Sequence, residues 1–316
     1  MAIARYGLFM ALWLVLLHCP AFAADEKKCE WHTHKDPGLC SYEPNTLGYT
    51  KDSDDNGFLD FKLSVRYQLI PAGTTGGFNH LYDGLGDNSA WYLAFTGRFG
   101  QYIESRDSSP VVAKRFNPKT FFRYWTDEEH RDYIDISPLA HESNGQSIDS
   151  AAEYQSAQTA SKKPQFADDE LSRGWDYLEA VWKKDVVPVG RLGALSTVVT
   201  LKYFLPYGPL QGRAEDYNAW ENNPQGKQRS HVNGIAGAIQ LHDEFDWRAF
   251  SHIKIAAMYE TGYREIFRYS TVRFEFSATL FQLPLNFWGQ SGYGSDLAQY
   301  YKKVDSYGVA LEIGGF

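Results

Sequence analysis

The most constraining feature of this sequence is a set of long segments in which apolar and polar residues alternate strictly. In the segment 58–70 the two alternating sets are Leu59, Phe61, Leu63, Val65, Tyr67 and Leu69 against Asp60, Lys62, Ser64, Arg66 and Gln68. A period of two places these sets on opposite faces of a β-strand. Similar stripes recur in 195–205, 270–281 and 306–316. Strands of soluble proteins usually run about 5–6 residues, whereas a tilted strand needs roughly 9–11 residues to cross a bilayer.

These strands predict an all-β fold, a transmembrane antiparallel β-barrel of about 12 strands that occupies residues 45–316. Such a barrel turns its apolar face to lipid and keeps charged residues in the lumen, and its closure satisfies every backbone hydrogen bond. No domain boundary is evident, and the polar segments 150–171 and 207–229 are expected to be long loops. The last residue, Phe316, is the terminal aromatic residue that is typical of bacterial outer-membrane barrels.

Composition taken alone would suggest a soluble protein, because the mean hydropathy is negative. The strand pattern outweighs it, since lumenal polar residues and loops lower the average in a barrel. The net charge of −8 and the absence of a Lys/Arg stripe argue against nucleic acid as a partner.

The N-terminus predicts export. Residues 1–23 combine Arg5, an apolar core and small residues at Ala21 and Ala23, which is the pattern of a secretory signal peptide. Residues 24–44 would then form a periplasmic segment before the barrel. This segment holds Cys29 and Cys40, and in an exported protein such a pair most simply forms a disulfide. A zinc site that adds His32 and His34 is the alternative.

A polar cluster lies in the stretch LAHESNGQSID, residues 139–149. His141 and Ser143 are two residues apart, so on a strand they share a face, where the imidazole could activate the hydroxyl as a nucleophile. Asp176, in phase with the apolar stripe of a later strand, could orient that histidine, because a lone carboxylate facing lipid is costly. Gly145 could offer its backbone N–H to an oxyanion.

On spacing alone, the same stretch is also explained as a polar turn, since Asn-Gly is a strong turn signal. Strand phase is a further difficulty, because Ile134 and Ile136 are out of register with His141. A β-bulge at Pro138 would reset the phase. The acidic run 52–57 resembles the start of an EF-hand, but Leu63 stands where a bidentate Glu is needed, which favours a hairpin turn.

The block from His141 to Gly145, followed by the block from Ser172 to Asp176, resembles outer membrane phospholipase A. The segments 43–53, 104–118 and 290–297 and the terminal Phe316 also resemble this family, so the likeness spans most of the mature chain. It implies calcium-dependent hydrolysis of phospholipid acyl esters in the outer membrane. Ser143 would be the nucleophile, His141 the base and Gly145 the oxyanion donor.

The resemblance also implies a Ca²⁺ site and a homodimer. The ligands would be the Ser172 side chain, the Gln146 carbonyl and Ser109 from the partner subunit, so pairing of two copies would complete the site. Two departures stand out. Asp176 occupies a position where the family typically carries Asn, which implies that Asn would be tolerated there. The connection 148–171 is long and carries an acidic cluster, Asp168, Asp169 and Glu170. A non-catalytic pore or scaffold that retains the motif is the competing hypothesis.

Overall fold

The structure is a computed structural model that describes residues 38–70, 88–106, 110–160, 164–186, 193–214, 223, 226–247 and 250–313. Several predictions made from sequence fall outside this part of the chain: the signal peptide 1–23, Cys29, His32, His34, Ser109 and Phe316. Cys40 is disulfide-bonded, as expected, but its proposed partner Cys29 is among these residues.

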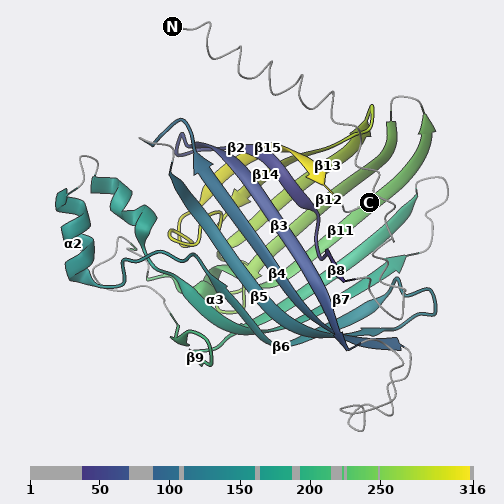
Figure 1. Ribbon diagram of the computed structural model, residues 1–316, viewed down its shortest axis with the longest axis horizontal. Helices are drawn as coiled ribbons and strands as arrows, with labels where there is room; N and C mark the ends of the chain where they lie inside the picture. Colours follow the sequence, from purple (N-terminus) through teal and green to yellow (C-terminus); the bar gives the residue numbers. More distant parts are fainter. Residues whose placement is uncertain are drawn as a thin grey trace, which may run out of the picture.

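Twelve antiparallel strands close into one barrel, which confirms the predicted fold class (Figure 1). Its strands are β2 (Asn45–Asp52), β3 (Gly57–Ile70), β4 (Ser89–Tyr102), β5 (Val111–Trp125), β6 (Tyr133–Ser143), β7 (Gly174–Val186), β8 (Ala194–Phe204), β11 (Gly234–Trp247), β12 (Phe250–Gly262), β13 (Ser270–Leu280), β14 (Leu283–Gly292) and β15 (Val304–Ile313). The ring closes because β2 pairs with both β15 and β3, and β3 pairs in turn with β4. A short strand, β1 (Leu39–Ser41), adds to β3.

The barrel has two different ends. Long connections that include α2 (Ala151–Ala160), the 3-10 helix η3 (Pro164–Glu170), the hairpin of β9 (Tyr207–Gly208) with β10 (Gly212–Arg213), and α3 (Arg229–Val232) gather at one end, called here the loop end. Figure 1 shows α2, α3 and β9 together there. No helix in the described part of the chain is long and apolar enough to cross a membrane.

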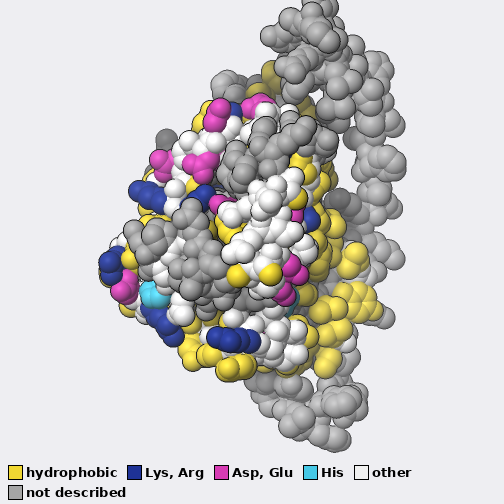
Figure 2. Space-filling view, turned by 90° about the vertical axis from the view of Figure 1, so that its left-hand side faces the viewer, with side chains coloured by type: hydrophobic (Ala, Val, Ile, Leu, Met, Phe, Trp, Pro, Cys, Tyr) yellow, Lys and Arg dark blue, Asp and Glu magenta, His cyan; other side chains and the backbone are white. Residues whose placement is uncertain are grey.

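The predicted alternation holds along the strands. On β3, Leu63, Tyr67 and Leu69 are each half exposed on the outer wall, while Ser64, Arg66 and Gln68 are buried inside. On β13, Phe274 and Phe276 are exposed in the same way. Hydrophobic side chains line the flank of the molecule in Figure 2, whereas polar and charged ones cover the loop end. An exposed apolar band around a closed barrel is what a lipid environment requires.

Ion pairs between different elements stabilise the lumen. Lys119 contacts Glu179 at 2.6 Å, Arg123 contacts Asp135 at 2.7 Å, and Arg229 of α3 contacts Glu142 at 2.7 Å. All six side chains are nearly inaccessible to solvent. Each of these six buried charges therefore has a partner, which is the condition under which such charges are tolerated.

Strand β6 contains the predicted bulge. The register of β6 against β7 shifts between Ser137 and Ala140, on either side of Pro138. Before the shift, Ile134 and Ile136 face outward, and after it the odd-numbered residues do. The bulge therefore brings His141 onto the lipid-facing wall.

The connection 144–173 differs from the loop expected from its sequence, because it contains α2 and η3. Helix α2 begins with a pair of hydrogen bonds: Glu153 N–H donates to the Ser150 hydroxyl, and Asp149 N–H donates to the Glu153 carboxylate. Ser150 and Glu153 thus act as an S-x-x-E capping signal. The helix was not predicted because its sequence has little apolar periodicity. The run 52–57, by contrast, is the expected hairpin turn between β2 and β3, in which Asp52 accepts from the N–H groups of Asp54 and Asn56.

Candidate active site

The centre of the candidate site is a histidine–aspartate pair on the outer wall. His141 of β6 and Asp176 of β7 are directly opposed in the ladder, and His141 Nδ1 lies 2.7 Å from Asp176 Oδ1. The Asp176 side chain is completely buried, although Leu178, the next residue on its face, is exposed. A carboxylate bonded to Nδ1 leaves Nε2 as the basic nitrogen, which is the arrangement a general base needs.

A segment of the loop end covers Asp176. Residues 205–213, called here the strap, contain the β9–β10 hairpin. The strap begins with a bond from Leu205 N–H to the Asp176 carbonyl at 2.8 Å. The N–H groups of Leu210 and Gln211 then both donate to Asp176 Oδ2, at 2.7 and 2.9 Å. Sequence analysis missed these partners, because backbone donors leave no residue-type signal.

Two glycines allow the strap to lie this close to the wall. A Cβ on Gly208 would come within 2.1 Å of Asp176 Oδ2, and a Cβ on Gly174 would come within 2.2 Å of the Gln211 carboxamide. A side chain at Gly208 would force the strap away from Asp176, whereas one at Gly174 would displace the Gln211 carboxamide, which is the end of a flexible side chain. The contact thus explains how a carboxylate can face lipid: both of its oxygens have hydrogen-bond partners, one on Oδ1 and two on Oδ2.

Ser143 occupies the next outward position on β6 after His141. It is the last residue of the strand and is opposed by Gly174 on β7 and by Phe116 on β5. Gly145 follows with a φ of +60°, a left-handed conformation that favours glycine, and it is exposed. The turn and the catalytic interpretation of this stretch are therefore compatible, because the chain turns directly after the serine.

Asn144 fixes that turn from inside. Its side chain is fully buried, donates to the Leu171 carbonyl at 2.7 Å, and accepts from the N–H groups of Arg173 and Gln146 at 2.9 and 3.3 Å. Sequence reasoning gave Asn144 no role of its own. The structure shows that it joins the segment after Ser143 to the segment before Gly174.

This joint brings together two of the residues proposed to bind calcium. Ile148 forms a bridge with Leu171, and Ser172 N–H donates to the Ile148 carbonyl at 2.8 Å. Gln146 and Ser172 therefore lie on adjoining segments beside Ser143. Their donors, a backbone carbonyl and a hydroxyl, are the oxygen ligands that a hard cation prefers, but they are neutral and few. No group of three or more His, Cys, Asp and Glu suited to a metal ion occurs among the described residues.

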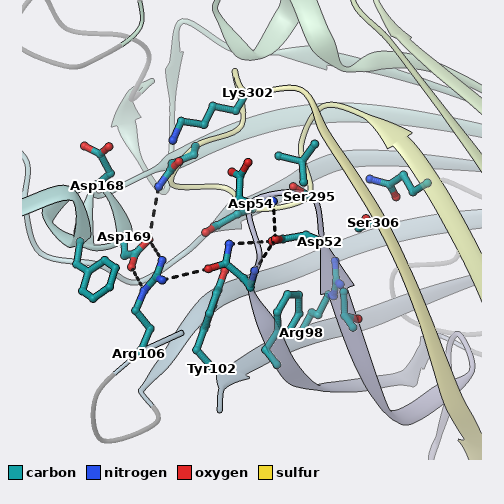
Figure 3. A pocket seen from close by; sticks show the side chains of 18 of the residues that line it. Asp52, Asp54, Arg98, Tyr102, Arg106, Asp168, Asp169, Ser295, Lys302 and Ser306 are labelled. Carbon is teal, nitrogen blue, oxygen red and sulfur yellow. Dashed lines mark hydrogen bonds and ion pairs between the residues drawn. The ribbon is translucent and has the colours of Figure 1, made fainter. Parts of the chain in front are cut away.

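The acidic cluster of the long connection has structural partners. Asp168 accepts a hydrogen bond from the Tyr154 hydroxyl at 2.5 Å, which joins η3 to α2. Asp169 pairs with Arg106 at 2.7 Å, and the two joined side chains line a pocket of about 300 Å³ (Figure 3). The Asp169 carbonyl accepts from Gln146 Nε2 at 3.1 Å. The acidic cluster is therefore connected to Gln146 of the candidate site by a hydrogen bond.

Comparison with known proteins supports the fold. No family model matches the chain, and no curated protein matches its sequence. Solved structures do match. Among them are outer membrane phospholipase A from Escherichia coli, with a TM-score of 0.59, 19% identity, and coverage of 88% of this chain and 99% of that one, and the calcium-bound dimer of the Salmonella typhi outer membrane phospholipase, with a TM-score of 0.60, 18% identity, and coverage of 90% and 95%. The chain thus has the twelve-stranded outer-membrane barrel fold of outer membrane phospholipase A.

Proposed function

We propose that this protein is a calcium-dependent phospholipase of the outer membrane, which hydrolyses phospholipid acyl esters with Ser143, His141 and Asp176. The observation that carries the proposal is the arrangement of these three residues on the lipid-facing wall. The buried Asp176 is hydrogen-bonded to His141 at 2.7 Å, and Ser143 occupies the next outward position after His141 on β6. A carboxylate on this wall is costly unless it is paired, and its pairing with a histidine next to a serine is the arrangement that a catalytic triad requires.

In the proposed mechanism, Ser143 Oγ attacks the ester carbonyl while His141 Nε2 takes its proton. Asp176 stabilises the imidazolium and holds the ring in the productive tautomer. The proton then passes from His141 to the departing glycerol oxygen, and water repeats the sequence on the acyl-enzyme. Gly145 is exposed and has no side chain of its own, so its N–H is the donor that we assign to the oxyanion.

We propose that Gln146 and Ser172 hold Ca²⁺ through the carbonyl and the hydroxyl, with Ser109 of a second copy completing the site. A bound Ca²⁺ would supply positive charge near the developing oxyanion. Because the donors within one copy are neutral and few, calcium binding and homodimer formation should favour each other. The calcium-bound dimer of the Salmonella typhi phospholipase supports this part of the proposal.

The direct test is the release of fatty acid and lysophospholipid from mixed micelles by the detergent-purified protein. We expect release in calcium, little release in chelator, and none from Ser143→Ala. Ser147→Ala is the matched control, since Ser147 is an exposed serine four residues further on. Equal release by Ser143→Ala and the wild type would refute the assignment.

The competing function is a pore or scaffold. A cavity of about 1180 Å³ lies within the barrel, lined by side chains that include Lys62, Arg98 and Glu275. A pore would conduct ions in planar bilayers and would show no hydrolysis. Conductance together with absent hydrolysis would favour this alternative.

A further inference from the structure

The two sides of Ser143 differ in chemistry. On the β5 side, Phe116 directly opposes Ser143, and its ring lies 5.5 Å from that of Phe99 in an edge-to-face pair. The Phe116 ring also lies 3.1 Å from where a Gly145 Cβ would be. This flank is apolar and aromatic.

On the β7 side, the flank is polar. Gly174 has no side chain, and the Gln211 carboxamide fills its place, with Oε1 2.2 Å and Nε2 3.2 Å from the position of a Gly174 Cβ. Directly opposed residues of an antiparallel pair have Cβ positions about 4.5–5.5 Å apart. The Gln211 carboxamide therefore occupies the place of the side chain that would directly oppose Ser143. Within the described part of the chain, the Gln211 side chain makes no hydrogen bond, whereas the Gln211 backbone N–H donates to Asp176.

A phospholipid ester has the same asymmetry. Its acyl side is hydrocarbon, and its alcohol side is glycerophosphate, rich in oxygen acceptors. A carboxamide offers two N–H donors to such oxygens. An aromatic flank suits the hydrocarbon chain.

We propose that the Gln211 side chain binds the glycerophosphate portion of the substrate and so orients the scissile ester on Ser143, with the acyl chain along Phe116 and Phe99. This inference rests on the proposed function and assigns a substrate-contacting residue within it. Gln211 thus has two separable parts: its backbone caps Asp176, and its side chain selects the substrate.

The test compares two substrates in Gln211→Ala, which keeps the backbone N–H. One is a diacyl phospholipid, and the other is a p-nitrophenyl ester of the same acyl chain, which lacks glycerophosphate. We expect kcat/KM for the phospholipid to fall about tenfold, the effect of one lost hydrogen bond to a polar acceptor, and kcat/KM for the p-nitrophenyl ester to change less than about twofold. Gln155→Ala, at an exposed glutamine of α2, should change neither.

Equal losses on both substrates would overturn the inference, because the carboxamide would then act on the acyl carbonyl or on the fold. An unchanged phospholipid rate would overturn it as well. Binding of a non-hydrolysable ether phospholipid separates this inference from the proposed function. If the wild type hydrolyses neither ester but Gln211→Ala still weakens ether-lipid binding about tenfold, the hydrolase assignment fails and the lipid contact stands. Unchanged ether-lipid binding would refute the contact.

Discussion

Asp176→Asn is the substitution on which sequence resemblance and structure disagree. The resemblance implies that Asn is tolerated, because the family typically carries it at this position. In this chain, however, Asp176 Oδ2 already accepts from two backbone N–H groups, those of Leu210 and Gln211. An asparagine has only one acceptor oxygen, and both of its orientations are unfavourable here.

In the first orientation, the Asn oxygen faces the strap and its NH₂ faces His141 Nδ1. The histidine is then held in the wrong tautomer, a defect that costs about 10⁴ in kcat in a soluble serine protease. In the second orientation, the oxygen faces His141 correctly, but the NH₂ confronts two N–H donors. Each buried unsatisfied donor costs about 1–3 kcal/mol, so this productive orientation is disfavoured by at least about 2 kcal/mol. Since about 1.4 kcal/mol is tenfold, we expect kcat/KM to fall at least about thirtyfold.

The assay is phospholipid hydrolysis by detergent-purified protein, with folding checked by β-type circular dichroism and heat-modifiable migration. Asp185→Asn is the control, because Asp185 lies on the same strand and bonds to Ser196 at the opposite end. If Asp176→Asn retains activity within about threefold of the wild type while Ser143→Ala is inactive, the strap does not constrain this carboxylate as the structure indicates.

Three other perturbations probe the surroundings of the site. Asn144→Ala should abolish most activity while the barrel still folds, because it leaves the N–H groups of Arg173 and Gln146 unpaired at about 1–3 kcal/mol each; gel migration and hydrolysis check this. Arg106→Met should raise the calcium concentration at half-maximal activity by about tenfold or more, because an unpaired Asp169 would loosen the segment that contacts Gln146; a calcium titration checks this. Burial raises the pKa of Asp296, in the connection 293–303, to about 6, and the nearby Asp169 adds to the shift. A carboxyl group with a raised pKa stabilises the folded state below its unfolded pKa, and this contribution is lost as pH rises through 6. Amide protection of 293–303, corrected for intrinsic exchange, should therefore fall between pH 5 and pH 7.5, and Asp296→Asn should remove that fall.

The barrel was predictable from sequence because each outward position has to be apolar and each inward one polar. On β3 that rule alone assigned Leu63 and Tyr67 to the outer wall and Arg66 to the lumen, as the structure has them. The bulge at Pro138 was predictable for a related reason, since the phase of the apolar stripe changes across it. The pairing of His141 with Asp176 followed once the two strands were adjacent.

The support of the site could not be predicted in the same way. The strap binds Asp176 through backbone N–H groups, and Gly174 and Gly208 contribute by lacking side chains, so no residue pattern marks the contact. Asn144 stood in the recognised motif, yet its partners lie in a segment far along the chain. Such contacts depend on how two connections meet in space, and local periodicity carries no information about that.

The most direct test of the central claim is covalent labelling of the nucleophile. An active-site-directed sulfonyl fluoride sulfonylates an activated serine with loss of fluoride, and mass spectrometry of the digested protein locates the adduct. If His141 and Asp176 activate Ser143, the label should appear on Ser143 in the wild type, persist in Ser147→Ala, and disappear in His141→Ala. An unlabelled Ser143 in protein that still hydrolyses phospholipid, or equal labelling of Ser143 with and without His141, would contradict the account.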